Sequence, residues 1–126
     1  MEPQYTNQSH EDCRPSMITQ AQKYSDLSPC NKRKVGCVVV KDGKVISYGF
    51  NHGYHEKCSC SMDEKNPHVL HAEQMALCGE DREVYKGATL YVTYKPCDKC
   101  EILIKQCEIK EVFYLNRSGE LQCKTL

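Results

Sequence analysis

The apolar residues at the start of the chain predict one helix behind a polar lead-in. Residues 1–15 have no apolar period, and we expect a flexible N-terminal lead-in there. Ser16 is a candidate N-cap, and apolar residues then recur at near-helical spacing: Met17, Ile18, Ala21 and Tyr24. Pro29 does not continue a helix, so we expect this one to end before it.

The rest of the chain alternates strand-like and helix-like patterns. In order, it predicts strands over 35–40 and 45–50, a helix over 71–78, a strand over 88–94, a helix over 98–107 and a strand over 112–115. Asp42-Gly43, between the first two strands, is a strong hairpin signal. Residues 51–67 mix histidine, glycine, cysteine and charge without a period, which is typical of a functional loop.

This order of elements predicts one α/β domain over residues 16–126 with a mixed sheet. A hairpin opens the domain, and we expect the later strands, separated by helices, to run parallel with right-handed crossovers. Potential metal ligands fall at two junctions where a helix begins. In α/β sheets such junctions face the crevice beyond the carboxyl ends of the strands, where ligands usually bind.

The ligands at these junctions are His71 and the pair Cys97 and Cys100, a set that suits zinc. One imidazole and two thiolates fill three positions of a tetrahedral zinc ion and leave the fourth open to a water molecule. The start of a helix favours the thiolate form of both cysteines. Zinc would lower the pKa of that water towards neutrality. Glu73, two residues after His71, is then the expected carrier of the proton that the water gives up.

Two less specific interpretations fit Cys97-x-x-Cys100 when it is taken alone. One is a structural zinc ribbon closed by four ligands, and the other is a redox-active cysteine pair. The upstream His-x-Glu favours a catalytic zinc site over both alternatives, because H-x-E followed by P-C-x-x-C is the signature of zinc-dependent nucleobase deaminases.

Composition narrows the choice of partner and compartment. The 126 residues carry 17 basic and 17 acidic side chains, and this zero net charge argues against binding duplex nucleic acid or tRNA. Ten cysteines without an apolar leader indicate reduced thiols in the cytoplasm, or in the host cytoplasm if the protein is viral. No apolar run approaches the roughly 20 residues of a membrane span. We therefore expect a soluble metalloprotein that binds a small molecule.

Several further segments occur in the order typical of a known family. They cover residues 36–40, 48–51, 71–77, 87–93, 96–100 and 109–115. Over residues 16–115 the chain resembles the cytidine and deoxycytidylate deaminase superfamily, and within it the deoxycytidylate (dCMP) deaminase branch. The resemblance implies a cytidine-deaminase-like three-layer fold with a mixed central sheet. It also implies a homo-oligomer.

The resemblance assigns three residues to the base and sugar of a nucleotide. It implies that Asn51 hydrogen-bonds the nucleotide, although an asparagine after a strand is often only a turn residue. Val35 would lie beside the pyrimidine. The backbone near the small residue Ala72 would approach the edge of the base.

Charge and position suggest further contacts around the sugar and phosphate. Lys34 is a candidate for the 5′-phosphate, with Lys32 and Arg33 as alternatives; the other interpretation is a solvated, charged turn before a strand. Tyr94 stands where dCMP deaminases often carry an apolar or small residue. It fits either packing beside the sugar or the core at a strand end.

The chain departs from the family pattern after the last predicted strand. The family's final helix and strand are missing or reduced to residues 117–119 and a short tail, so we expect a C-terminally shortened fold.

A second, structural zinc is predicted from another group of ligands. Some phage dCMP deaminases hold such an ion, and the candidate ligands here are Cys30, Cys58, Cys60 and His68. A closed site of three cysteines and one histidine would tie the 51–67 loop to the core. Leu70 stands where a glutamate ligand would be, and the alternative is a set of free thiols with a loop histidine.

The predicted activity is hydrolytic deamination of a cytosine nucleotide at C4, with dCMP giving dUMP and ammonia. Two enzymatic alternatives remain open: a tRNA adenosine deaminase, and a deaminase of cytosine, guanine or cytidine. A third alternative is a non-catalytic zinc-binding nucleotide sensor, and Glu73 counts against it because a scaffold does not require that carboxylate.

Overall fold

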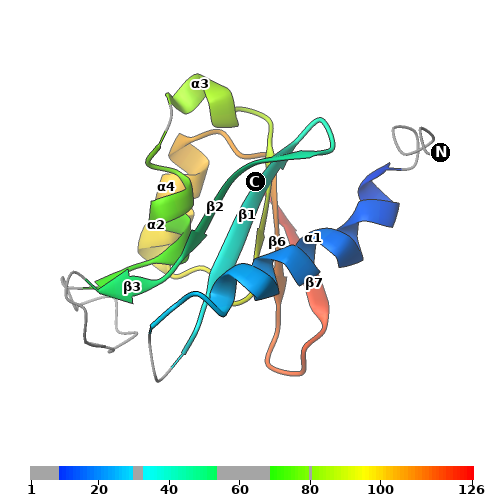
Figure 1. The fold of residues 1–126 in the computed structure, drawn as a ribbon. Helices are drawn as coiled ribbons and strands as arrows, with labels where there is room; N and C mark the ends of the chain where they lie inside the picture. Colours follow the sequence, from blue (N-terminus) through cyan, green and yellow to red (C-terminus); the bar gives the residue numbers. More distant parts are fainter. Residues whose placement is uncertain (1–8, 30–32, 54–68, 80) are drawn as a thin grey trace.

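The computed structural model describes residues 9–29, 33–53, 69–79 and 81–126 (Figure 1). Its first helix, α1, spans Ser9–Ser25 and therefore begins seven residues before the predicted N-cap at Ser16. That prediction is wrong, and residues 9–15 belong to α1. Pro15 removes one backbone hydrogen bond from this helix without ending it. The rest of the expected lead-in, residues 1–8, lies outside the described residues.

A five-stranded mixed sheet forms the centre of the molecule. Its strands, in spatial order, are β2 (Lys44–Phe50), β1 (Gly36–Lys41), β5 (Thr89–Val92), β6 (Glu111–Leu115) and β7 (Leu121–Thr125). Strand β1 pairs antiparallel with both β2 and β5, whereas β5 and β6 are parallel. The predicted mixed sheet is confirmed.

The turn between β1 and β2 forms as its residues predict. Lys41 and Lys44 are paired, so Asp42 and Gly43 make a two-residue hairpin loop. Both loop residues have positive φ angles, 55° and 79°, as a type I′ turn requires. Glycine adopts such an angle without steric cost, and aspartate is among the few other residues that tolerate it.

Helices cover both faces of the sheet (Figure 1). Helix α1 packs on one face with Val38, Val40, Tyr91 and Phe113. Helices α2 (Ala72–Ala76) and α4 (Asp98–Gln106) pack on the other face with Cys37, Val39, Leu90 and Val92. Because β1 and β5 are buried on both faces, their sequences are largely apolar instead of alternating, with polar residues only at Lys41 and Thr89. The three-layer α/β fold is confirmed.

The C-terminal tail is more regular than the sequence indicated. After β6 the chain turns through residues 116–120 and returns as β7, which pairs antiparallel with β6. Asn116 fixes this turn, because its Oδ1 accepts hydrogen bonds from the backbone amides of Ser118 and Glu120. Residues 117–119 lie in this turn, and the last strand, which was expected to be missing or reduced, is present as β7. The sequence did not predict this edge strand, because its residues are half-buried or exposed and form no apolar run.

Three short elements complete the described chain. A small antiparallel sheet joins β3 (His52–Gly53) to β4 (Val69–Leu70), and α3 (Arg82–Tyr85) precedes β5. None of the three was predicted. The four candidate ligands of a second zinc, Cys30, Cys58, Cys60 and His68, lie outside the described residues. Within the described part of the chain, no helix has the length and apolar character needed to cross a membrane.

Candidate active site

The three predicted zinc ligands meet where two helices begin. His71 is the N-cap residue of α2, Cys97 is the N-cap residue of α4, and Cys100 lies in the first turn of α4. The His71 Nδ1 atom lies 3.7 Å from Cys97 Sγ and 3.3 Å from Cys100 Sγ. All three ligand atoms lie within 4.8 Å of one another. The fold therefore brings together ligands from two distant segments.

Local contacts fix His71 at the entry to α2. The Gln74 Oε1 atom accepts a hydrogen bond from the His71 amide at 2.8 Å, and the His71 carbonyl accepts one from Met75 at 3.1 Å. The far end of the helix is held as well, because the Ser47 hydroxyl of β2 donates to the Ala76 carbonyl. These contacts set where His71 and Glu73 lie relative to the sheet.

Glu73 lies on α2 beside the ligand cluster and is buried, with 4% of its surface exposed. Burial raises the pKa of its carboxyl to about 7, although hydrogen bonds from its own backbone and from Cys100 partly oppose this. Burial and the neighbouring Glu73 carboxylate also raise the pKa of the Cys100 thiol. A divalent cation at the ligand atoms would favour the charged forms of both groups. A carboxyl that titrates near neutral pH suits general acid–base chemistry.

A pocket opens beside this cluster. It is lined by Arg33, Val35, His71, Ala72, Glu73, Tyr94, Lys95 and Cys97. Val35 and Ala72, which the resemblance assigned to the base, thus line the same pocket as Glu73 and two of the three ligands, His71 and Cys97. The side chains of Val35 and Ala72 are buried and apolar, so they provide a surface suited to a flat ring.

Asn51 is placed differently from the other predicted substrate contacts. Its side chain is fully buried; its Oδ1 atom accepts a hydrogen bond from the Val35 amide, and its Nδ2 atom donates to the Arg33 carbonyl, both at 2.8 Å. The Asn51 amide donates to the Val35 carbonyl as well. Asn51 therefore holds the segment before β1 against the end of β2. Its contact with a nucleotide stays a prediction.

The basic residues near the pocket are only partly those that the sequence singled out. Lys34 is exposed and does not line the pocket, Lys32 lies outside the described residues, and Arg33 lines the pocket together with Lys95. Tyr94 is 37% exposed and lies at the pocket, not in the core. The sequence analysis gave Lys95 no role; its place between a strand end and Pro96 was the only available signal.

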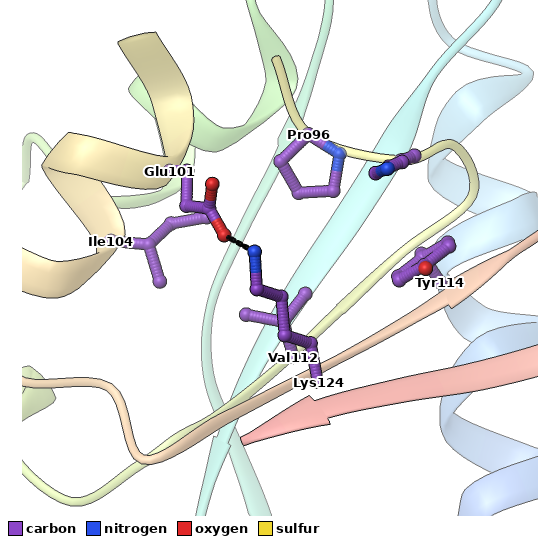
Figure 2. A pocket seen from close by; sticks show the side chains of 7 residues that line it. Pro96, Glu101, Ile104, Val112, Tyr114 and Lys124 are labelled. Carbon is purple, nitrogen blue, oxygen red and sulfur yellow. Dashed lines mark hydrogen bonds and ion pairs between the residues drawn. The ribbon is translucent and has the colours of Figure 1, made fainter. Parts of the chain in front are cut away.

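A second hollow is lined in part by the loop that carries Pro96 (Figure 2). Its lining side chains come from that loop, α4, β6 and β7: Lys95, Pro96, Glu101, Ile104, Val112, Tyr114 and Lys124. An ion pair between Glu101 and Lys124 spans it. It contains none of the three ligands and no Glu73, so the chemistry of the site belongs to the first pocket.

The donor set fits zinc. One imidazole nitrogen and two sulfurs from helix starts match the ligand types of catalytic zinc sites, in which three protein ligands leave one position open. Among the described residues, this is the one group of three potential ligands close enough to hold a metal ion.

Comparison with known proteins agrees with this geometry. Residues 11–116 match the model of the family described as "Cytidine and deoxycytidylate deaminase zinc-binding region". The chain belongs to this family. The match includes both helix starts that carry the ligands, and the zinc-binding character of the cluster follows from the family and the donor set together.

Curated relatives of this deaminase-family chain are similar over most of its length. A deoxycytidylate deaminase of Saccharomyces cerevisiae is 38% identical over 119 residues, covering 80% of this chain and 38% of the yeast protein. A deoxycytidylate deaminase of Mycobacterium phage D29 is 38% identical over 108 residues, covering 72% of this chain and 84% of the phage protein. Among the first four curated relatives, the chain spans between 32% and 54% of the relative's length.

One solved structure is similar to this chain in both fold and sequence. The dCMP deaminase of cyanophage S-TIM5, in complex with dCMP and dUMP, is 33% identical with a TM-score of 0.71. The alignment covers 92% of this chain and 84% of the cyanophage chain. The cytidine-deaminase-like fold is therefore shown by sequence and structure alike.

Proposed function

We propose that the protein deaminates dCMP hydrolytically to dUMP and ammonia. The observation that carries this proposal is the cluster of His71, Cys97 and Cys100, of which His71 and Cys97 line one pocket together with the buried Glu73. The yeast and phage D29 relatives are deoxycytidylate deaminases, and the cyanophage enzyme was solved with dCMP and dUMP. These likenesses support a cytosine nucleotide as the substrate.

His71, Cys97 and Cys100 would hold the zinc ion through Nδ1 and two Sγ atoms. Bound there, zinc supplies a Lewis acid that lowers the pKa of a coordinated water molecule to near 7. The two helix starts keep the three ligand atoms together before the ion arrives, because His71 and Cys97 are held by the backbone of α2 and α4. The site is thus organised by the fold.

Glu73 moves the proton in the proposed reaction. Its carboxylate takes a proton from the attacking water, delivers it to the ring nitrogen next to C4, and assists its transfer to the leaving amine. A new C4–O bond forms, the C4–N bond breaks, and ammonia leaves, so dCMP and water give dUMP and ammonia. Burial supports this role, since it raises the pKa of the Glu73 carboxyl above its ordinary value and so eases the uptake of a proton.

The pocket walls would orient the base. Val35 and Ala72 offer buried apolar surface next to Glu73, and a cytosine ring between them would present C4 to the ligand cluster. The resemblance also gives Asn51 a hydrogen bond to the nucleotide; Asn51 does not line the pocket itself, but its side chain holds the backbone of Val35 and Arg33, which do.

Three further expectations accompany this function. A second, structural zinc on Cys30, Cys58, Cys60 and His68 would stabilise the loop between β3 and β4. The protein would assemble as a homo-oligomer. It would act in the cytoplasm, or in the host cytoplasm if it is viral.

An ammonia-release assay over a substrate panel tests the proposal. The panel contains dCMP, CMP, dCTP, deoxycytidine, cytosine, guanine and an adenosine-containing tRNA stem-loop. We expect the highest kcat/KM for dCMP. Activity confined to the tRNA substrate or to a free base would replace the proposed substrate, and no activity on any compound with a zinc-loaded protein would favour the nucleotide sensor.

A further inference from the structure

Arg33 and Tyr94 form a pair at the pocket beside the ligand cluster. The guanidinium carbon of Arg33 lies 4.1 Å from the centroid of the Tyr94 ring, within the range of a cation–π contact. Both side chains line the pocket that contains His71 and Glu73. The ring covers one face of the guanidinium, while the N–H donors around its edge remain available to a ligand.

The backbone of Arg33 is held by a hydrogen bond, in addition to the contact of its side chain with Tyr94. Asn51 binds the Arg33 carbonyl and the Val35 amide, each at 2.8 Å, and so holds the chain on both sides of Lys34. An arginine whose backbone and side chain are both held loses little conformational freedom when it binds a ligand. Arg33 is therefore preorganised to bind a ligand that enters the pocket.

Charge indicates the chemistry of that ligand. Neither Arg33 nor Lys95 has an ion-pair partner among the residues that the structure describes. Among the described residues that line the pocket, Glu73 is the only carboxylic acid, and it is buried beside the metal ligands. A guanidinium without an ion-pair partner at the exposed part of a pocket suits an anionic group, and its planar shape suits a phosphate in particular.

We infer that Arg33, supported by Tyr94, binds the 5′-phosphate of the substrate and makes the enzyme prefer a nucleotide to a nucleoside. The inference rests on the proposed function, because it concerns the same pocket. It assigns the phosphate to Arg33 instead of the neighbouring Lys34, because both side chains are exposed but only Arg33 lines the pocket. Tyr94 is a positioning residue that acts through Arg33.

The effect of this contact belongs to binding and not to the chemical step. The phosphate is remote from C4, so its contact with Arg33 is equally strong before and during the reaction. Such uniform binding lowers KM and leaves kcat unchanged. Loss of a hydrogen-bonded charge pair typically weakens binding by about ten- to a hundredfold.

The test compares Arg33→Gln, Tyr94→Leu, Tyr94→Phe and Lys34→Gln in the full chain. Lys44→Gln is the matched control, because it removes one exposed charge at the β1–β2 hairpin, away from the pocket. Two readouts are used: KM and kcat with dCMP and with deoxycytidine, and calorimetric affinity for dUMP and for deoxyuridine.

Arg33→Gln should raise KM for dCMP and weaken dUMP binding by about ten- to a hundredfold, with kcat and both nucleoside values unchanged. Tyr94→Leu should shift the same quantities less, and Tyr94→Phe should retain more of the nucleotide preference than Tyr94→Leu because it keeps the ring face. Lys44→Gln should match the wild type.

Two results would overturn the inference. One is an equal loss for nucleotide and nucleoside in Arg33→Gln, which would indicate a structural role. The other is a loss of the preference in Lys34→Gln but not in Arg33→Gln. A wild type that deaminates no cytosine compound would refute the proposed function alone, since the comparison of dUMP with deoxyuridine would still decide the role of Arg33.

Discussion

At the scale of single residues, burial distinguishes Glu73 from the other described acidic side chains. Among the side chains that the structure describes, Glu73 is the only buried carboxylic acid or basic group, and it lies beside three metal ligands. The sequence predicted these four residues because their types and spacing carry the chemistry. It did not predict the hydrogen bonds of Asn51, nor that Arg33 and not Lys34 lines the pocket. Both depend on how the segment before β1 lies against the end of β2.

Removal of one thiolate should empty the catalytic metal site. We expect Cys97→Ala to lose one zinc ion per chain relative to the wild type, whether or not the second predicted site is filled, because two remaining ligands hold zinc weakly. Elemental analysis of the dialysed protein measures this. Cys78→Ala is the matched control, since Cys78 is exposed and outside the ligand cluster. Equal zinc contents in Cys97→Ala and the wild type would contradict the assignment.

Asn51 should contribute to stability in addition to any contact with the nucleotide. Asn51→Ala leaves the buried Val35 amide and the Arg33 carbonyl without their side-chain partner, and we expect unfolding free energy to fall by about 1–3 kcal/mol. Urea unfolding provides the measurement. Asn116→Ala should cost less, because water can replace its hydrogen bonds at an exposed turn. A variant of Asn51 as stable as the wild type would show that these hydrogen bonds add nothing.

At the scale of elements, the sequence predicted correctly those turns, strands and helices that depend on neighbouring residues. The Asp42-Gly43 turn, the buried strands and helix α4 formed within one or two residues of their expected bounds, since each depends on nearby residues. Helix α1 began earlier than predicted, and β7 was missed because an edge strand needs only a partner and no continuous apolar run. Helix α2 shows how packing between elements sets the site: it lies so close to β2 that only glycine fits at position 49.

The close approach of α2 to β2 predicts a strong effect of a single methyl group. A Cβ atom at Gly49 would lie 2.1 Å from the Ala72 carbonyl oxygen, so Gly49→Ala must displace the helix that carries Glu73. We expect a loss of stability of about 1–3 kcal/mol, measured by thermal unfolding. Gly79→Ala is the matched control, because a Cβ atom added there would meet no atom within 4 Å and the backbone angle is ordinary. Equal melting temperatures for the two variants would refute the packing argument.

At the scale of the whole molecule, strand order places the chemistry at one end of the sheet. Strands β5 and β6 run parallel, so the connection between them must cross over, and α4 makes that crossing with its first turn at the ligand cluster. The alternation of patterns in the sequence predicted an α/β domain, whereas the three layers of the family fold were implied by the resemblance. The short β3–β4 sheet that leads into His71 did not, because it depends on pairing between two-residue segments across a loop.

The central claim is that a buried Glu73 beside the His71, Cys97 and Cys100 cluster carries out the deamination of dCMP. Its most direct test is conversion of dCMP to dUMP by zinc-loaded wild type and Glu73→Gln, with zinc content measured on the same samples. We expect Glu73→Gln to keep its zinc and its fold but to lose kcat by about 10²- to 10⁴-fold, the usual contribution of a general acid–base group. The exposed Glu108→Gln should match the wild type. Turnover of Glu73→Gln near the wild-type rate would contradict the account.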